Sequence, residues 1–430
     1  MEKIDSHVII GSERRPRGFV EELLEDKQQL CLSTYRALHK GTIRGIPSTG
    51  MFFAHFAHAL LLGKERQEVI RPLYDCAQIL AINLGPYTQK ERGYHGWFQD
   101  LPVFWPYEGK RLISTSEWLD AFAVTFILRD PFQQGRMLLD IEASDIDIWD
   151  VSDPEATGDH NDVRRVLFRL FRAFWITEDT DIHERIRDMV TYSAPEYIGG
   201  SAAQDMFHYL YLPLAELLIA IHRNDRATKY PEKLRFALEC HKKYYTEIAQ
   251  RQYEFENADF DSKGYIALCI TGLAAYAYDN YGLEPDIESG YMPLWLVKGE
   301  FPSYEEAFPE ISPRPPFEEK NITLSLTTKD PVEDWHPIWL NTLRWIKQQP
   351  DMPHLFRLGD EVEERELAKS VSGAVVCDIE GDEPGKLVVF SIQPVAIAAP
   401  EQWLSQMKHR WADFAATQLS APLTEVSFHD

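Results

Sequence analysis

The chain has 430 residues, of which 44% are hydrophobic and 12% aromatic, so it can bury a core large enough to offset the entropy lost on folding. Its 68 acidic residues outnumber its 44 basic ones, and the net charge of −24 argues against nucleic acid and anionic membranes as partners and favours a basic partner. Its five cysteines form no C-x-x-C pair, which indicates reduced core thiols rather than a disulfide framework or a zinc site.

The N-terminal third is predicted to be helical. The first residues lack an apolar segment with a small-residue cleavage site, so we expect no export signal and a cytoplasmic location. Apolar residues recur at helical intervals over 19–38 and predict a first helix. Two further apolar runs, 51–62 and 69–84, predict a helical hairpin, in which Pro72 should bend or restart the second helix.

Two segments without helical periodicity are candidates for partner binding. Residues 87–110 predict an aromatic loop, and residues 142–162 an acidic one, with helices expected at 114–128 and 132–141 between them. Aromatic anchors concentrate binding energy at interfaces, and an acidic rim speeds the capture of a basic partner. The alternative is that the rings pack into the core and the carboxylates only face water. The candidate partner-binding residues are Trp97, Phe98, Trp105, Asp145, Asp147, Trp149, Asp150 and Asp153.

Helical periodicity returns in the middle of the chain. It covers 163–175, 182–192 and 206–221, and Pro213 must introduce a kink in the last of these. The next helix, 230–252, is expected to begin with Pro231, because proline is favoured in the first turn of a helix.

The most apolar helix is expected to follow, with Ser262 as its N-cap and Gly282 as its stop. Residues 265–278 are apolar or small on every side, so this helix is predicted to lie at the centre of a helical domain, and it is too short to span a bilayer. Asp279 near its C-terminus opposes the helix dipole and needs a compensating group. That group is either a structural partner within the chain or a binding partner.

A second domain is predicted beyond a proline-rich, acidic linker at 301–319. The order β-α-β-β-α-β over 320–430 suggests a ferredoxin-like sandwich with two helices on one face of an antiparallel sheet, although residues 352–369 do not fit this pattern. The expected fold is therefore mainly α, with an all-helical domain over 1–300 and a smaller α+β domain.

An ordered series of segments resembles a known family. The run ALECHKKYY at 237–245 precedes the apolar helix, which closes on Tyr-Asp-x-x-Gly, and YMPLWLV follows at 291–297. Together they resemble immunity protein 49 of bacterial polymorphic toxin systems, most clearly over 163–297. The resemblance implies a mostly helical cytosolic protein that binds and blocks one toxin. The residues that carry it are His241, Tyr278, Asp279, Gly282, Tyr291 and Pro293.

No catalytic or metal motif is predicted. His55 and His58 lack the neighbouring acidic ligand of H-E-x-x-H, which favours a structural role, and the acidic run 145–150 has Asp150 where a calcium loop requires glycine. The chain has no G-x-S-x-G, Walker or dinucleotide-binding motif. The acids Glu178, Asp179 and Asp181 cannot be assigned as catalysts without geometry. We therefore predict no catalytic residues and no cofactor.

Three functions stay open at this point. The first is a non-catalytic immunity protein that neutralises a cognate, basic toxin by stoichiometric binding. The second is an all-helical hydrolase that reverses a toxin's covalent modification, and the third is a helical adaptor or scaffold. The C-terminal domain could widen the toxin contact, restrict the pairing to one toxin, or promote formation of a homo-oligomer.

Overall fold

The computed structural model describes the chain except residues 1, 13–14, 40–47, 91–92, 106, 108–110, 133, 148–161, 177–180, 199, 250–260, 312–313, 329–331, 333–335, 350–374, 379–385, 391–394, 421 and 430. The chain divides into two compact units. The first consists of Met1–Tyr35, Gly45–Gln99 and Trp105–Ile311, and the second of Arg36–Arg44, Asp100–Phe104 and Ser312–Asp430. The first is mainly helical and the second is mainly α+β, which confirms the predicted fold class.

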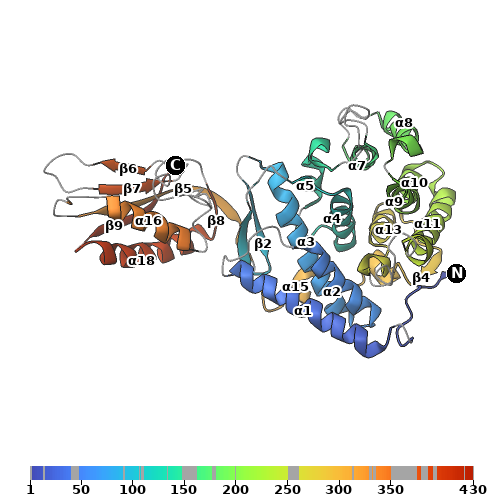
Figure 1. Ribbon diagram of the computed structural model, residues 1–430, viewed down its shortest axis with the longest axis horizontal. Coiled ribbons are helices and arrows are strands. Elements are labelled where there is room, and N and C mark those ends of the chain that lie inside the picture. The colour runs from blue at the N-terminus through green and yellow to red at the C-terminus, as the bar shows by residue number, and fades with distance from the viewer. Residues whose placement is uncertain are drawn as a thin grey trace. The chain divides into compact units, whose positions relative to one another are not determined.

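Three long helices open the first unit (Figure 1). The helix α1 spans Arg17–His39, α2 spans Thr49–Leu61 and α3 spans Arg66–Thr88, so the predicted helix and helical hairpin are confirmed. Pro72 was expected to bend or restart the second helix, and no restart occurs, since α3 continues through it. Every residue of α3 from Val69 to Tyr87 is buried except Arg71, and this packing compensates for the hydrogen bond that proline cannot make.

Strands replace part of the predicted aromatic loop. The strand β2 spans Tyr94–Phe98, β3 spans Leu101–Trp105, and the two form a two-stranded sheet. The prediction of a loop over these residues is wrong, because aromatic side chains that alternate between buried and half-buried positions are typical of a strand. The helices that follow are α4 (Thr115–Leu128), α5 (Gln134–Asp140), η1 (Ala143–Asp145), α7 (Val163–Ala173) and α8 (Ile182–Tyr192).

Two helices of this unit contain a π-helical segment. The helix α9 (Ser201–Met206) continues through the π-helical η3 (Phe207–Tyr211) into α10 (Leu212–His222). A kink was predicted at Pro213, and the irregularity that the structure shows is the wider π-helical turn just before this residue. The helix α11 (Arg226–Lys243) continues into the π-helical η4 (Tyr244–Ile248). The predicted start at Pro231 is wrong, because α11 begins at Arg226 and accommodates the proline in its second turn.

The apolar helix α13 (Leu268–Tyr281) lies between α4 on one side and α10 and α11 on the other (Figure 1), which confirms its central position. Gly282 ends it in the left-handed conformation with φ of 63°, as predicted. The N-cap prediction is wrong: Asp261, rather than Ser262, caps a short 3₁₀ helix, η6 (Ser262–Gly264), and α13 begins only at Leu268. The Asp261 carboxylate accepts the Lys263 backbone amide at 2.9 Å, as an N-cap side chain does.

Short elements surround the exit of α13. The strand β4 (Ile287–Ser289) pairs in parallel with β1 (Glu2–Ile4). The helix α14 (Leu294–Val297) follows, and α15 (Tyr304–Ala307) packs on α3 within the first unit. Part of the segment predicted as a linker is thus a folded element.

The second unit contains a five-stranded sheet among its described residues, with β5 (Phe317–Thr327) in the middle. β5 pairs antiparallel with β7 (Lys386–Phe390) and β9 (Leu423–His429), and β6 (Val375–Asp378) pairs antiparallel with β7. The order β6-β7-β5-β9 is that of the predicted ferredoxin-like sandwich. The strand β8 (Val395–Ala398) pairs with the start of β5 and was not predicted.

Two helices, α16 (His336–Gln348) and α18 (Pro400–Gln418), share one hydrophobic core with the sheet. The ring centroids of Trp345 and Trp411 are 5.4 Å apart, and the indole N–H of Trp411 donates to the Ser325 carbonyl at 2.7 Å. Both helices therefore cover the same face of the sheet. The residues 352–369, which fitted the predicted pattern poorly, lie outside the described part of the chain.

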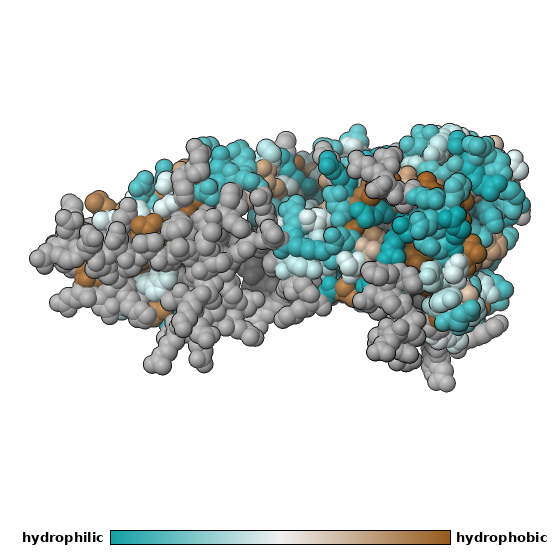
Figure 2. Space-filling view, turned by 90° about the horizontal axis from the view of Figure 1, so that it is seen from above, coloured by the Kyte–Doolittle hydropathy of each residue, from teal (hydrophilic) through white to brown (hydrophobic). Residues whose placement is uncertain are grey.

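On the face drawn in Figure 2, hydrophilic residues predominate and hydrophobic residues occupy separate spots. Among the described helices, none combines the length and the apolar character that crossing a membrane requires.

Candidate functional site

The predicted aromatic anchors are mostly buried. Phe98 is fully buried, and its ring lies against Phe52 at 5.5 Å and Tyr35 at 6.2 Å. Trp105 is 9% exposed, and Trp97 is half-buried. Phe98 and Trp105 therefore stabilise the core in this structure, and Trp97 is the one of the three rings that reaches the surface.

The described carboxylates of the predicted acidic loop have partners within the chain. Asp145 is 5% exposed and lies 3.0 Å from the Lys90 ammonium. Asp147 accepts a hydrogen bond from the Thr115 backbone amide at 3.0 Å and pairs with the Arg164 guanidinium at 2.5 Å. Asp147 thus stabilises the start of α4 and the packing of α7, whereas Asp145 pairs with Lys90. Trp149, Asp150 and Asp153 lie outside the described residues.

Asp279, one of the residues that carry the family resemblance, pairs with Arg129. Its carboxylate lies 3.0 Å from Nε of Arg129, which confirms the structural alternative predicted for this residue. The Arg129 guanidinium also donates to the carbonyl oxygens of Leu296 at 3.0 Å and Val297 at 2.6 Å. The pair thus ties the end of α13 to the end of α4 and to α14.

Tyr291, Pro293 and Tyr278 also have structural surroundings. Tyr291 is fully buried, and its hydroxyl accepts the backbone N–H of His7 at 2.8 Å, which fixes the N-terminal segment. Pro293 precedes α14 as its N-cap residue, and the half-buried ring of Tyr278 lies 5.9 Å from the Lys298 ammonium. The ring of Tyr291 also contacts His241 at 5.2 Å, which leads to a cavity.

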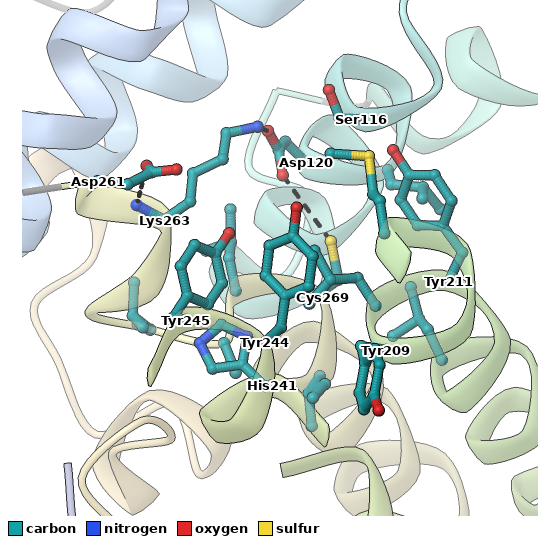
Figure 3. A pocket seen from close by; sticks show the side chains of 18 of the residues that line it. Ser116, Asp120, Tyr209, Tyr211, His241, Tyr244, Tyr245, Asp261, Lys263 and Cys269 are labelled. Atoms are coloured by element: carbon teal, nitrogen blue, oxygen red, sulfur yellow. Dashed lines mark hydrogen bonds and ion pairs between the residues drawn. The ribbon is translucent and has the colours of Figure 1, made fainter. Parts of the chain in front are cut away.

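The first unit contains a cavity of about 420 Å³ beside the start of α13 (Figure 3). Its walls come from α2, α4, α9, both π-helical segments, α10, α11, η6 and α13. Apart from a few polar groups, the lining side chains are apolar or aromatic, as is usual for pockets that bind small molecules. The aromatic residues that line it are Phe53, Tyr209, Tyr211, Tyr244 and Tyr245.

An ion pair occupies one side of this cavity (Figure 3). The ammonium of Lys263 lies 2.8 Å from the Asp120 carboxylate, and Sγ of Cys269 lies 3.8 Å from the other oxygen of Asp120. Burial disfavours the charged lysine, but the adjacent Asp120 carboxylate outweighs it and raises the pKa of Lys263. Burial and the Asp120 carboxylate raise the pKa of Cys269 well above its usual range, so the thiol stays protonated and is a poor nucleophile.

His241 contributes a neutral polar group on another side. It is 6% exposed, and burial lowers its pKa to about 3. Its ring forms a hydrogen bond with the Gly264 backbone that favours the protonated form, as a bond to a carbonyl oxygen does. Among the described residues, the buried Nε2 of His241 has no hydrogen-bond partner.

The cavity owes its shape to local backbone features. The π-helical segments η3 and η4 bring tyrosines from two helices to its walls, and such segments often occur at functional sites. Gly264 lies against the ring of Tyr245, where an added Cβ would come within 2.8 Å of that ring. Sequence reasoning singled out His241 as a site residue but none of the other lining residues, because they lie on separate elements that only the fold brings together.

His58 and Asp181, which the sequence offered as possible metal-ligand and catalytic residues, have hydrogen-bond partners within the chain. Nδ1 of His58 lies 2.6 Å from the Ala54 carbonyl oxygen, so this histidine is held by its own helix. Asp181 caps α8 by accepting the His183 amide at 2.9 Å, whereas Glu178 and Asp179 lie outside the described residues. In the described part of the chain, no three His, Cys, Asp or Glu residues are grouped so that they could hold a metal ion.

Comparison with known families gives one match. Residues 87–296 match the family model of immunity protein 49, which confirms the resemblance seen in the sequence. The matched segment includes α4, both π-helical segments and α13, and hence nearly all of the cavity lining. Searches of curated proteins and of solved structures returned no match.

Proposed function

We propose that this chain is an immunity protein that neutralises one cognate bacterial toxin by binding it mole for mole. The observation that carries the proposal is the match of residues 87–296 to the immunity protein 49 family, which implies an antitoxin role. That segment contains the central helix α13 and the helices packed around it. To the family's antitoxin role the proposal adds a mode of action, in which the protein inhibits the toxin by staying bound to it.

Charge supports a basic toxin as the partner. The net charge of −24 attracts a cationic surface at long range and speeds encounter with it. Many enzymes that act on nucleic acid have basic surfaces, and an acidic inhibitor would resemble their substrate in charge. We therefore expect the association rate to fall as salt is added, because salt screens this attraction.

The contact surface is proposed to include Trp97 and the acidic segment that follows η1. Trp97 is the partly exposed ring among the predicted anchors, and Trp149, Asp150 and Asp153 stay candidates from sequence. The buried Phe98 and Asp145 would act indirectly, by supporting this surface.

The chemistry of the Cys269 thiol favours inhibition by binding over catalysis. Sγ of Cys269 lies 3.8 Å from the Asp120 carboxylate in the cavity, yet its raised pKa keeps the thiol protonated at neutral pH. A hydrolase that reverses a toxin's modification would need an activated nucleophile or water. Burial and the Asp120 carboxylate instead make the Cys269 thiol less reactive.

A titration separates binding from turnover. The toxin from the adjacent reading frame is purified, and its activity is measured while this protein is added in increasing amounts. We expect inhibition to be complete at one protein per toxin. Complete protection by far less than one equivalent, or the absence of a complex, would overturn the proposal.

A charge-reversal pair tests the contact surface. We expect Asp150→Lys with Asp153→Lys to slow association with the toxin by about tenfold or more, since two unit charges change sign near the contact. The matched control is Glu22→Lys with Glu25→Lys on exposed positions of α1, which changes the net charge equally. Equal effects of the two pairs would show that the acidic segment is not the contact.

A further inference from the structure

We propose that the edge strand β9 of the second unit pairs with β9 of a second copy of the chain, so that two sheets join into one across a twofold axis at Val426. This pairing does not involve the toxin, and it gives the second unit the task of holding two copies together. Four features carry it: the free edge, the groove beside it, the match of the strand to itself, and the charges along the edge.

The strand β9 lies at an edge of the sheet. Among the described strands it pairs only with β5, and β6 forms the opposite edge (Figure 1). An edge strand leaves alternate backbone N–H and C=O groups unpaired, and soluble proteins usually protect it with proline, lysine or a β-bulge. The residues Leu423–His429 include no proline and no lysine, and their register with Asn321–Thr327 is continuous. The edge is therefore open to a further strand.

A groove runs along this edge. It has a volume of about 590 Å³ and lies between α18, which contributes Leu404 and Lys408, and residues 424–428 of β9. Five consecutive strand residues line it, so the groove follows the backbone of β9 rather than one face of the sheet. Leu423, where the strand begins, is 57% exposed. The backbone groups that a second strand requires are thus accessible along most of β9.

The strand is complementary to itself. Val426 is its middle residue, so an antiparallel pair with the twofold axis there uses the whole strand. Val426 is 2% exposed and packs into the core, so its neighbours Glu425 and Ser427 point to the opposite face. In this register Glu425 of each copy lies opposite Ser427 of the other, whose hydroxyl can donate to the carboxylate. No two like charges face each other across the pair.

The charges along the edge favour a second copy over the toxin. The groove lining contains one cation, Lys408, and one anion, Glu425, so it carries no net charge although the whole chain carries −24. A basic toxin gains no attraction at such a place, whereas two copies meet there without local repulsion. At long range the two acidic chains repel each other, so the dimer should tighten as salt is added. Binding of a basic toxin should respond to salt in the opposite direction.

The contact is small. Two strands of seven residues, with the groove beside them, fall at the lower end of interface sizes, which is typical of weak complexes. We therefore expect a dissociation constant on the order of 10 μM.

Sedimentation velocity of the full chain, over a concentration series that spans this value and at low and high salt, measures the dimer. Hydrogen exchange at low and high protein concentration localises it, and the β9 amides should exchange more slowly at high concentration. A monomer throughout the series, a dimer that weakens with salt, or β9 exchange that ignores concentration would overturn the proposal.

Substitutions at Ser427 test the register by their sign. Ser427→Glu places a carboxylate opposite Glu425 at two symmetric positions and should weaken the dimer about fivefold, whereas Ser427→Lys places an ammonium there and should tighten it about fivefold. A loss of folding cannot produce the tightening. Gln406→Glu and Gln406→Lys change the net charge equally at an exposed position of α18 outside the groove, and both should leave the dimer nearly unchanged.

Equal effects at the two positions would show that the strands do not pair about Val426. A chain that stays monomeric would still titrate the toxin at one protein per toxin, so this proposal and the proposed function fail separately.

Discussion

Replacing Gly272 by alanine should destabilise the first unit, although the same change usually stabilises a helix. Gly272 lies where α13 crosses α4, and an added Cβ would come within 2.6 Å of the Cα and 2.9 Å of the carbonyl oxygen of Ala123. Both are backbone atoms in a buried helix, so no side chain can rotate away. The two helices must separate instead.

The magnitude follows from two opposing terms. Alanine in place of glycine inside a helix contributes about 1 kcal/mol of stability through propensity. Overpacking of a filled core costs about 1–3 kcal/mol, and contact with the backbone places this site at the upper end. We therefore expect Gly272→Ala to lower the free energy of unfolding by about 2 kcal/mol.

A matched control is available at Gly18 in α1, where an added Cβ meets no atom within 4 Å. Gly18→Ala should be neutral or stabilising by up to about 1 kcal/mol. Urea unfolding followed by circular dichroism gives both values, and hydrogen exchange of the α13 amides assigns the loss to the first unit. If Gly272→Ala were as stable as Gly18→Ala, the close packing of α13 on α4 would not be as described.

Three further predictions concern polar groups that are paired or buried within the first unit. Arg129→Met should lower the free energy of unfolding by about 2–3 kcal/mol, because carbonyl oxygens of α4 and α14 lose a charged donor. Asp279→Asn should cost under about 1 kcal/mol, because that carboxylate is 36% exposed and its pairing is screened; equal losses in urea titrations would contradict the assigned roles. His241, with its pKa of about 3, contributes stability that is complete above pH 6.5 and declines as the pH falls below 6.5, since the unfolded chain then binds a proton that the folded chain excludes. Between pH 6.5 and 5 the wild type should lose about 2 kcal/mol more than His241→Phe, and identical pH profiles in urea titrations would show that His241 is not held neutral.

The sequence correctly predicted the elements that depend only on residues close together in the chain. The apolar stretch of α13 indicated burial on all sides, Gly282 indicated its end, and the order of elements beyond residue 320 indicated the antiparallel sheet. Each follows from a side-chain pattern or a backbone preference within one segment. The family match over residues 87–296 rests on the same segments.

The errors arose where a residue's surroundings outweigh its own preference. Pro72 and Pro231 lie inside continuous helices because packing compensates for the missing hydrogen bond. For Phe98 the sequence left both an anchor and a core position open, and the ring faces the core, since the alternation of a short strand decides which side each ring takes.

By itself the sequence determined that the chain is acidic, mainly helical and built around one apolar helix, because composition and periodicity report charge and burial directly. Only the tertiary structure decided which distant residues meet. Asp120 reaches Lys263, Ala123 packs on Gly272, and His241 contacts Tyr291, because helices crossing at a given angle bring together positions that no spacing along the chain connects.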